Sequence, residues 1–424
     1  MWAVRPRPKL AVEAVDDALG AVARSEPVVK SWAFLSAERA RREAATSELH
    51  GTGPLAGLVT GVQDTFDTSD QLTQYGSPIY EGFRPVADAA AVALLRESGA
   101  ICLGKTVTGE LGTGVSAPTA NPHRPGYAVG GAAVGSAAAV AAGMVDLALA
   151  AQVDGDIVVA ASCCGIYGYK PTFGTVPTTG LKLLSPSLTT VGWFSRDPLT
   201  LDEVRCQLTG RPEAGALRGP PTIGLVRTEQ WGECSEASQR AVIAVADISE
   251  ALGARVVEVT TPPELMGLAG RHPRLLAYEA ARCLVWEHRL RRDKLSDRLR
   301  ETLDEGRSIG AQEADGLRSA VAAARAACGA MFAQCNAVLT PAVPSEASPV
   351  GHGPADTLFA RLWTMLGLPV VSVPAATGAS GMPLGVQLVG NVGDDAGLLG
   401  VVAWLTGEKA APVAGQGAPR GLFA

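Results

Sequence analysis

Charged residues are scarce in this chain of 424 residues, at 18% of the total, whereas hydrophobic residues make up 47%. Such a composition excludes a disordered chain, because the residues can bury enough apolar surface to offset the entropy lost on folding. Lysine is rarer still, with 7 of the 36 basic residues, and the arginines are scattered rather than gathered into a stripe. With a formal net charge of −6 as well, we expect no nucleic-acid partner.

The sequence also lacks long runs of bulky hydrophobic residues and ordered cysteine spacings. Residues 125–145 carry no charge, but they are built of Ala, Gly and Ser, which are typical of close-packed buried helices. The N-terminus shows no secretion signal. The eight cysteines, including the adjacent Cys163 and Cys164, match no disulfide or zinc-binding spacing, which indicates reduced and mostly buried thiols. We therefore expect a cytoplasmic protein without a membrane span, a metal or a cofactor.

The order of the apolar segments predicts an α/β protein. Residues 10–48 show helical spacing in two segments, with Ser36 placed to cap the second, and residues 1–50 are expected to pack as helices on the body. Short apolar strands then alternate with helices, as in an α/β sheet. Residues 200–340 are more polar and helical, which suggests a subdomain on the substrate side. Strands are expected at residues 55–62, 100–105, 147–153, 222–227, 255–259, 337–341, 370–374 and 383–390, and a final helix at 396–405.

Three segments are more specific than general α/β sequence. They are GLVTGVQD at residues 57–64, GGAAVGS at 130–136 and QVDGDIVVAASCCGIYGYKP at 152–171. Together with LTPAVP and GLPVVSVPA near the C-terminus, they resemble the amidase signature family in order and spacing over nearly the whole chain. The resemblance implies one large α/β domain over residues 51–424, with a central mixed β-sheet wrapped by helices.

The resemblance also implies serine-dependent hydrolysis of amides, in which a neutral lysine draws a proton through a bridging serine from a nucleophilic serine. Matched position by position, the lysine falls on Gln63, the bridging serine on Ala132 and the nucleophile on Asp156. The 24 positions from Ala132 to Asp156 agree with the family's spacing. Two further differences in the nucleophile loop are Asp154 in place of a glycine and Val158 in place of an arginine.

These differences make the expected site more negative by up to four charges. Two carboxylates would repel an oxyanion where the family stabilises one, so serine amidase activity is the least expected enzymatic activity. Two hypotheses remain open. In the first, the chain is a biosynthetic small-molecule enzyme, and Asp156, alone or with Asp154, acts as acid, base or nucleophile in a cyclisation, isomerisation, dehydration or ring opening. In the second, the chain is a catalytically inactive protein that binds a ligand or a partner.

Each candidate residue has a structural alternative. Asp156 is either a catalytic carboxylate or a decayed nucleophile position, and Asp154 either shares its space, which would raise one pKa, or caps a turn. Gln63 either orients a substrate or fills the volume of the missing lysine beside Asp64. A negative pocket favours a small-molecule ligand that carries positive charge, and the resemblance leaves a homodimer open. The remaining candidates for ligand contact are Gly131, Ala132, Gln152 and Gly155.

Overall fold

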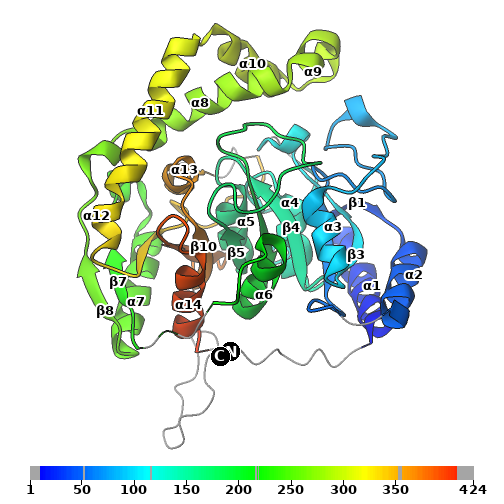
Figure 1. Cartoon of the computed structure of the whole chain (residues 1–424), viewed down its shortest axis with the longest axis horizontal. Coiled ribbons are helices and arrows are strands. Elements are labelled where there is room, and N and C mark those ends of the chain that lie inside the picture. Colours follow the sequence, from blue (N-terminus) through cyan, green and yellow to red (C-terminus); the bar gives the residue numbers. More distant parts are fainter. Residues whose placement is uncertain are drawn as a thin grey trace, which may run out of the picture.

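The computed structural model describes residues 10–50, 53–114, 117–214, 217, 219–351 and 356–407. In these residues, 11 strands form one sheet in the order β1-β3-β2-β4-β6-β5-β10-β11-β9-β7-β8 (Figure 1). Parallel pairs join β2 to β3 and β4, and antiparallel pairs run from β4 across to β9, so the sheet is mixed, as predicted. The strands are β1 (Trp32–Leu35), β2 (Val59–Gln63), β3 (Ile101–Thr106), β4 (Leu147–Gln152), β5 (Tyr167–Lys170), β6 (Thr190–Ser195), β7 (Thr222–Leu225), β8 (Arg255–Glu258), β9 (Ala337–Pro341), β10 (Val370–Thr377) and β11 (Pro383–Val389).

Helices cover both faces of this sheet. One apolar cluster joins the sheet to α3, α6, α7 and α14, and others join it to α1, α2, α4 and α5 and to the arm of α8, α10 and α11 seen at the upper left of Figure 1. Because both faces are covered, β2, β3, β6 and β9 are buried along their whole length. The helices are α1 (Ala11–Val29), α2 (Ala37–His50), α3 (Ala90–Glu97), α4 (Val134–Ala141), α5 (Asp156–Cys164), α6 (Pro198–Thr209), α7 (Glu236–Ala251), α8 (Leu268–Cys283), α9 (Val285–Leu290), α10 (Asp297–Ser308), α11 (Ala311–Ala327), α12 (Gly329–Phe332), α13 (Leu358–Met365) and α14 (Asp395–Leu405).

The turn between β4 and α5 fixes the position of the predicted catalytic loop. The strand is apolar and ends at Gln152, whose side-chain Oε1 accepts hydrogen bonds from the N–H groups of Ile157 and Val158 at 3.0 and 3.1 Å. This contact satisfies two of the N–H groups that a helix leaves free in its first turn. The turn therefore holds Asp156 rigidly at the start of α5, at the end of a buried strand.

Most expected elements are found near their predicted bounds. The strands expected between residues 55 and 153 appear as β2, β3 and β4, the last three appear as β9, β10 and β11, and the final helix is α14. The Ser36 hydroxyl accepts a hydrogen bond from the Arg39 N–H at 3.4 Å at the start of α2, as predicted. Three strands, β1, β5 and β6, were not expected. The strand pair around α7 extends the same sheet as β7 and β8.

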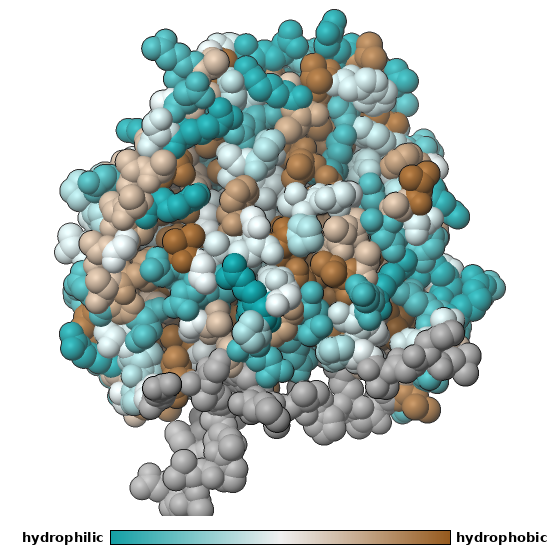
Figure 2. All heavy atoms as spheres, viewed as in Figure 1, coloured by the Kyte–Doolittle hydropathy of each residue, from teal (hydrophilic) through white to brown (hydrophobic). Residues whose placement is uncertain are grey.

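The surface and the thiols agree with a compact fold. Figure 2 shows hydrophilic residues spread over the visible face, with apolar residues in small groups between them. All eight cysteines are free and six of them are buried, as expected. Within the uncharged residues 125–145 the one helix is α4, and no helix of the described part of the chain is long and apolar enough to cross a membrane.

Candidate active site

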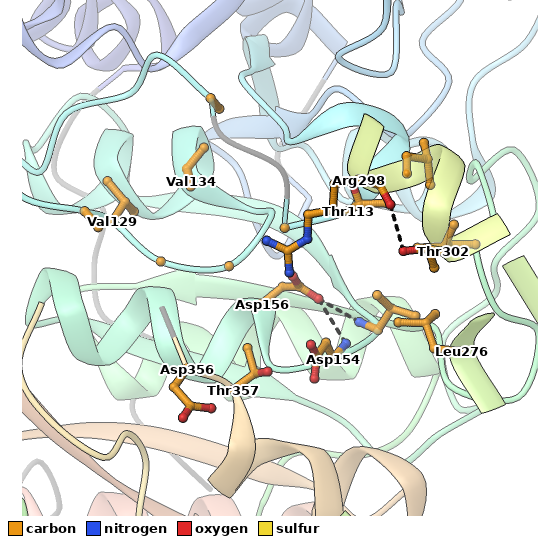
Figure 3. A pocket seen from close by; sticks show the side chains of 18 of the residues that line it. Thr113, Val129, Val134, Asp154, Asp156, Leu276, Arg298, Thr302, Asp356 and Thr357 are labelled. Atoms are coloured by element: carbon orange, nitrogen blue, oxygen red, sulfur yellow. Dashed lines mark hydrogen bonds between the residues drawn. The ribbon is translucent and has the colours of Figure 1, made fainter. Parts of the chain in front are cut away.

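A cavity of about 630 Å³ lies at the start of α5 (Figure 3). Asp154 and Asp156 line it from the turn after β4, and the glycine-rich segment 128–131 lines it before α4. Further walls come from elements far away in the sequence, among them the segment before α13, Arg361 on α13, and the helices α8 and α10. The side chains from these two helices are Leu276, Ala280, Arg298, Leu299 and Thr302.

The carboxylate of Asp156 is held by three backbone N–H groups. Its Oδ2 accepts hydrogen bonds from Val153 at 2.9 Å and Asp154 at 3.2 Å, and its Oδ1 accepts one from Ala132 at 2.8 Å. An ionised carboxylate offers about four lone-pair positions, so one position on Oδ1 has no backbone donor among the residues that the structure describes. The side chain is fixed in orientation, and it retains one site at which a proton can be accepted.

Burial raises the pKa of Asp156 to about 6, since the residue is only 2% exposed and its charged form is poorly solvated. The N–H groups of Val153, Asp154 and Ala132 oppose this rise, and the charge of Asp154 adds to it. A carboxyl group with this pKa is mostly ionised at neutral pH and can still take up a proton readily. Both properties are those of an efficient general base.

Asp154 belongs to a separate polar group beside Asp156. Its Oδ1 accepts a hydrogen bond from Nε of Arg361 at 2.9 Å and lies 3.6 Å from Nδ1 of the buried His272. Burial alone would raise the pKa of Asp154, but the charges of His272 and Arg361 and hydrogen bonds from Arg361 and Thr357 lower it. Burial also lowers the pKa of His272, and the guanidinium of Arg361 is the cation that donates a hydrogen bond to Asp154.

The two carboxylates therefore have different states. Asp154 points to Arg361 rather than sharing a proton with Asp156, and their pKa values move in opposite directions. The raised pKa that we expected for one of them is found on Asp156, but burial is its first cause and the charge of Asp154 only adds to it. The two carboxylates therefore do not form a pair that shares one proton.

The raised pKa of Asp156 predicts a measurable dependence of stability on pH. An aspartate in an unfolded chain titrates near 3.9, so the folded state binds this proton more tightly. The stabilisation is fully present below about pH 4, and it is lost as the pH rises through about 6, at an order of 3 kcal/mol. Urea unfolding of the wild type and of Asp156→Asn should show their stability difference change by this amount over that pH range. A constant difference would contradict the raised pKa.

The other predicted site residues are placed differently. Gly131 lines the cavity, whereas Gln63, Ala132, Gln152 and Gly155 do not. Gln63 is buried, its Nε2 donates to the Thr108 hydroxyl and its Oε1 accepts from the Ala151 N–H, both at 2.8 Å. This agrees with the volume-filling alternative, although Asp64 is paired with Lys105 and not with Gln63.

The remaining three candidates do not line the cavity and instead fix the backbone around Asp156. Ala132 supplies an N–H to Asp156, and Gln152 caps α5. Gly155 has no room for a side chain, because a Cβ there would lie 2.9 Å from Cβ of Ala360. These three residues contribute to the site by positioning its backbone.

Sequence reasoning missed the charged and polar residues that come from distant elements: His272, Arg298, Thr357 and Arg361. They lie more than 100 positions from Asp156, outside the segments that carry the family resemblance, and no local pattern marks them. No group of three or more His, Cys, Asp or Glu residues that could hold a metal ion is found in the described part of the chain.

Comparisons with known proteins match nearly the whole chain. The family model described as Amidase matches residues 13–399. A glutamyl-tRNA(Gln) amidotransferase subunit from Nitratidesulfovibrio vulgaris (strain DP4) is 32% identical over 449 aligned positions, which cover 92% of this chain and 92% of that protein.

Solved structures extend the similarity to the whole fold. A crystal structure of an amidase has a TM-score of 0.87 and 27% identity, covering 95% of this chain and 97% of that one. A chain from a vestigial protein complex, described as revealing the origins of an s-triazine catabolic enzyme, has a TM-score of 0.86 and 25% identity. It covers 95% of this chain and 96% of that one.

These findings overturn the function that we expected from the sequence. We expected a biosynthetic cyclisation, isomerisation, dehydration or ring opening, or a catalytically inactive binding protein. The relative and the solved amidase are named for amide chemistry, and neither name describes any of the expected reactions. The expectation was wrong because it took the negative charge near Asp156 as evidence against amide chemistry in general. In the structure, Arg361 neutralises Asp154.

Proposed function

The chain belongs to the amidase family, and we propose that it hydrolyses the carbon–nitrogen bond of a small amide in the cavity beside Asp156. The observation that carries this proposal is the carboxylate at the position matched to the family's nucleophile. It lines the cavity, it has a pKa of about 6, and one of its lone-pair positions has no backbone donor among the described residues. We infer that it takes the place of the serine, and that Gln63 and Ala132 take no part in proton transfer.

In the proposed reaction Asp156 acts as a general base. Its Oδ1 accepts a proton from a water molecule while the water oxygen forms a bond to the amide carbonyl carbon. The protonated Asp156 then gives this proton to the nitrogen of the tetrahedral intermediate. The carbon–nitrogen bond breaks, and a carboxylic acid and an amine or ammonia leave. Asp156 ends as it began, so one water is consumed for each amide.

The surroundings of Asp156 support these steps. Burial favours the protonated form of Asp156 that the first step produces, and Asp154 adds a smaller effect in the same direction although it is paired with Arg361. The positive end of the α5 dipole lies at the same point and favours the negative charge that develops on the carbonyl oxygen. Three backbone N–H groups keep Asp156 oriented toward the reacting water.

Mass spectrometry in ¹⁸O-labelled water tests this function directly. The purified protein is incubated with a metabolite extract of its source organism, and heat-denatured protein serves as the control. We expect one compound to disappear only with the native protein, and its products to sum to the substrate plus one water, with ¹⁸O in the new carboxyl group. A product that is an isomer or a dehydrated form of its substrate would refute amide hydrolysis. A ligand retained without any product would do so as well.

A further inference from the structure

Arg298 lines the cavity without having a partner in the described part of the chain. It extends from α10 into the cavity, its side chain is exposed, and its guanidinium forms no ion pair with a described carboxylate (Figure 3). The other arginine of the cavity, Arg361, is paired with Asp154, and Arg300 on the same helix is paired with Asp297. Among the residues that the structure describes, Arg298 is therefore the cation of this cavity that is available to a ligand.

The walls beside Arg298 indicate the shape of the compound it would bind. Leu276, Ala280 and Leu299 supply apolar surface from α8 and α10, and Thr302 lies one turn further along α10. The Thr302 hydroxyl donates a hydrogen bond to the backbone carbonyl oxygen of Arg298 at 3.0 Å, so the guanidinium of Arg298 takes no part in this contact. A ligand in this cavity would meet the guanidinium of Arg298, the apolar walls from α8 and α10, and the carboxylate of Asp156.

The carboxylates of Asp156 and Asp356 also line the cavity, so an anionic group on the ligand is favoured beside Arg298 and not elsewhere in it. We expected a positively charged ligand because Asp154 and Asp156 both carry negative charge. The ion pair with Arg361 offsets the charge of Asp154. A guanidinium presents several N–H donors in one plane, which matches the two oxygens of a carboxylate. We propose that Arg298 binds a carboxylate group of the substrate, so that the substrate class is a small amide that also carries a carboxylate. This inference rests on the proposed amide hydrolysis.

Binding measurements separate this inference from the reaction itself. The probes are the mono-amides of linear dicarboxylic acids, from succinamate to suberamate, each compared with the uncharged diamide by isothermal titration calorimetry at low salt. We expect the wild type to bind at least one mono-amide roughly tenfold more tightly than its diamide, as a charge-assisted hydrogen bond provides. Higher salt should weaken this preference.

Variants on one helix provide the controls. Arg298→Ala should abolish the preference for the mono-amide and Arg298→Lys should keep part of it. Arg307→Ala removes an exposed arginine of α10 that does not line the cavity, and it should change nothing. Equal or absent binding of both probes by the wild type would overturn the role of Arg298, and so would a preference that survives Arg298→Ala. A preference without any hydrolysis would reject the proposed reaction but not the carboxylate site.

Discussion

Asp156→Asn is expected to lower the rate of amide hydrolysis by about a thousandfold while the fold is kept. Asparagine has nearly the size of aspartate, and its carbonyl oxygen can still accept hydrogen bonds from Val153 and Asp154. Its amide nitrogen then faces the N–H of Ala132, so the third hydrogen bond is lost. Asparagine cannot accept a proton at neutral pH, so the attacking water loses its base. The variant also removes a buried charge whose pKa is raised to about 6, which offsets the lost Ala132 hydrogen bond, so we expect a stability close to that of the wild type at neutral pH.

The measurement is kcat/KM for the amide identified by mass spectrometry, with thermal unfolding of each variant. Asp247→Asn is the matched control, because it makes the same substitution on the exposed face of α7, away from the cavity. It should retain the wild-type rate. An Asp156→Asn enzyme within a few fold of the wild-type rate would exclude Asp156 as the general base.

Gly131→Ala is expected to destabilise the fold by about 3 kcal/mol and to slow the reaction at least a hundredfold. Gly131 has a φ of +67°, which costs an alanine on the order of 1–2 kcal/mol. Its Cβ would also lie 2.6 Å from Cα of Asp156 and 2.8 Å from the Asp156 carbonyl oxygen, so the backbone of the site must move. A shift of about 1 Å at a catalytic group is enough for a loss of this size in rate.

Gly174→Ala separates the two causes. Gly174 has a φ of +78°, but a Cβ there would meet nothing within 4 Å. This control should lose only the 1–2 kcal/mol due to the backbone conformation, and it should keep the wild-type rate. If Gly131→Ala and Gly174→Ala had the same stability and the same rate, the close contact of residue 131 with Asp156 would have no effect on function.

The sequence predicted those parts of the fold that have clear local patterns. The strands expected at residues 337–341 and 383–390 agree with β9 and β11 within one residue at each end, because both are short apolar runs next to proline or glycine. β6 was missed because it is buried on both faces and shows no alternation, and because Gly192 interrupts it. That glycine is required by packing, since a Cβ would lie 2.2 Å from the Tyr169 carbonyl oxygen, and a sequence pattern does not show this.

The candidate site was only partly predictable for a similar reason. Asp154, Asp156 and Gly131 lie in the segments that resemble the family, and all three line the cavity. Arg361 lies 207 positions from Asp154, and only the folded sheet brings them together. Without this arginine, the charge of the site was overestimated from the sequence, and the expected reaction was wrong as a consequence.

The general-base role of Asp156 is tested by comparing the pH dependence of kcat/KM with the titration of the Asp156 carboxyl group. The carboxyl carbon is observed by ¹³C NMR in aspartate-labelled protein, and the Asp156→Asn spectrum identifies its signal. We predict that kcat/KM rises with pH and that both curves have a midpoint near pH 6, since the ionised form is the base. A rate that does not change between about pH 5 and pH 8, or a carboxyl group that titrates near 4, would contradict the assignment of Asp156 as the general base.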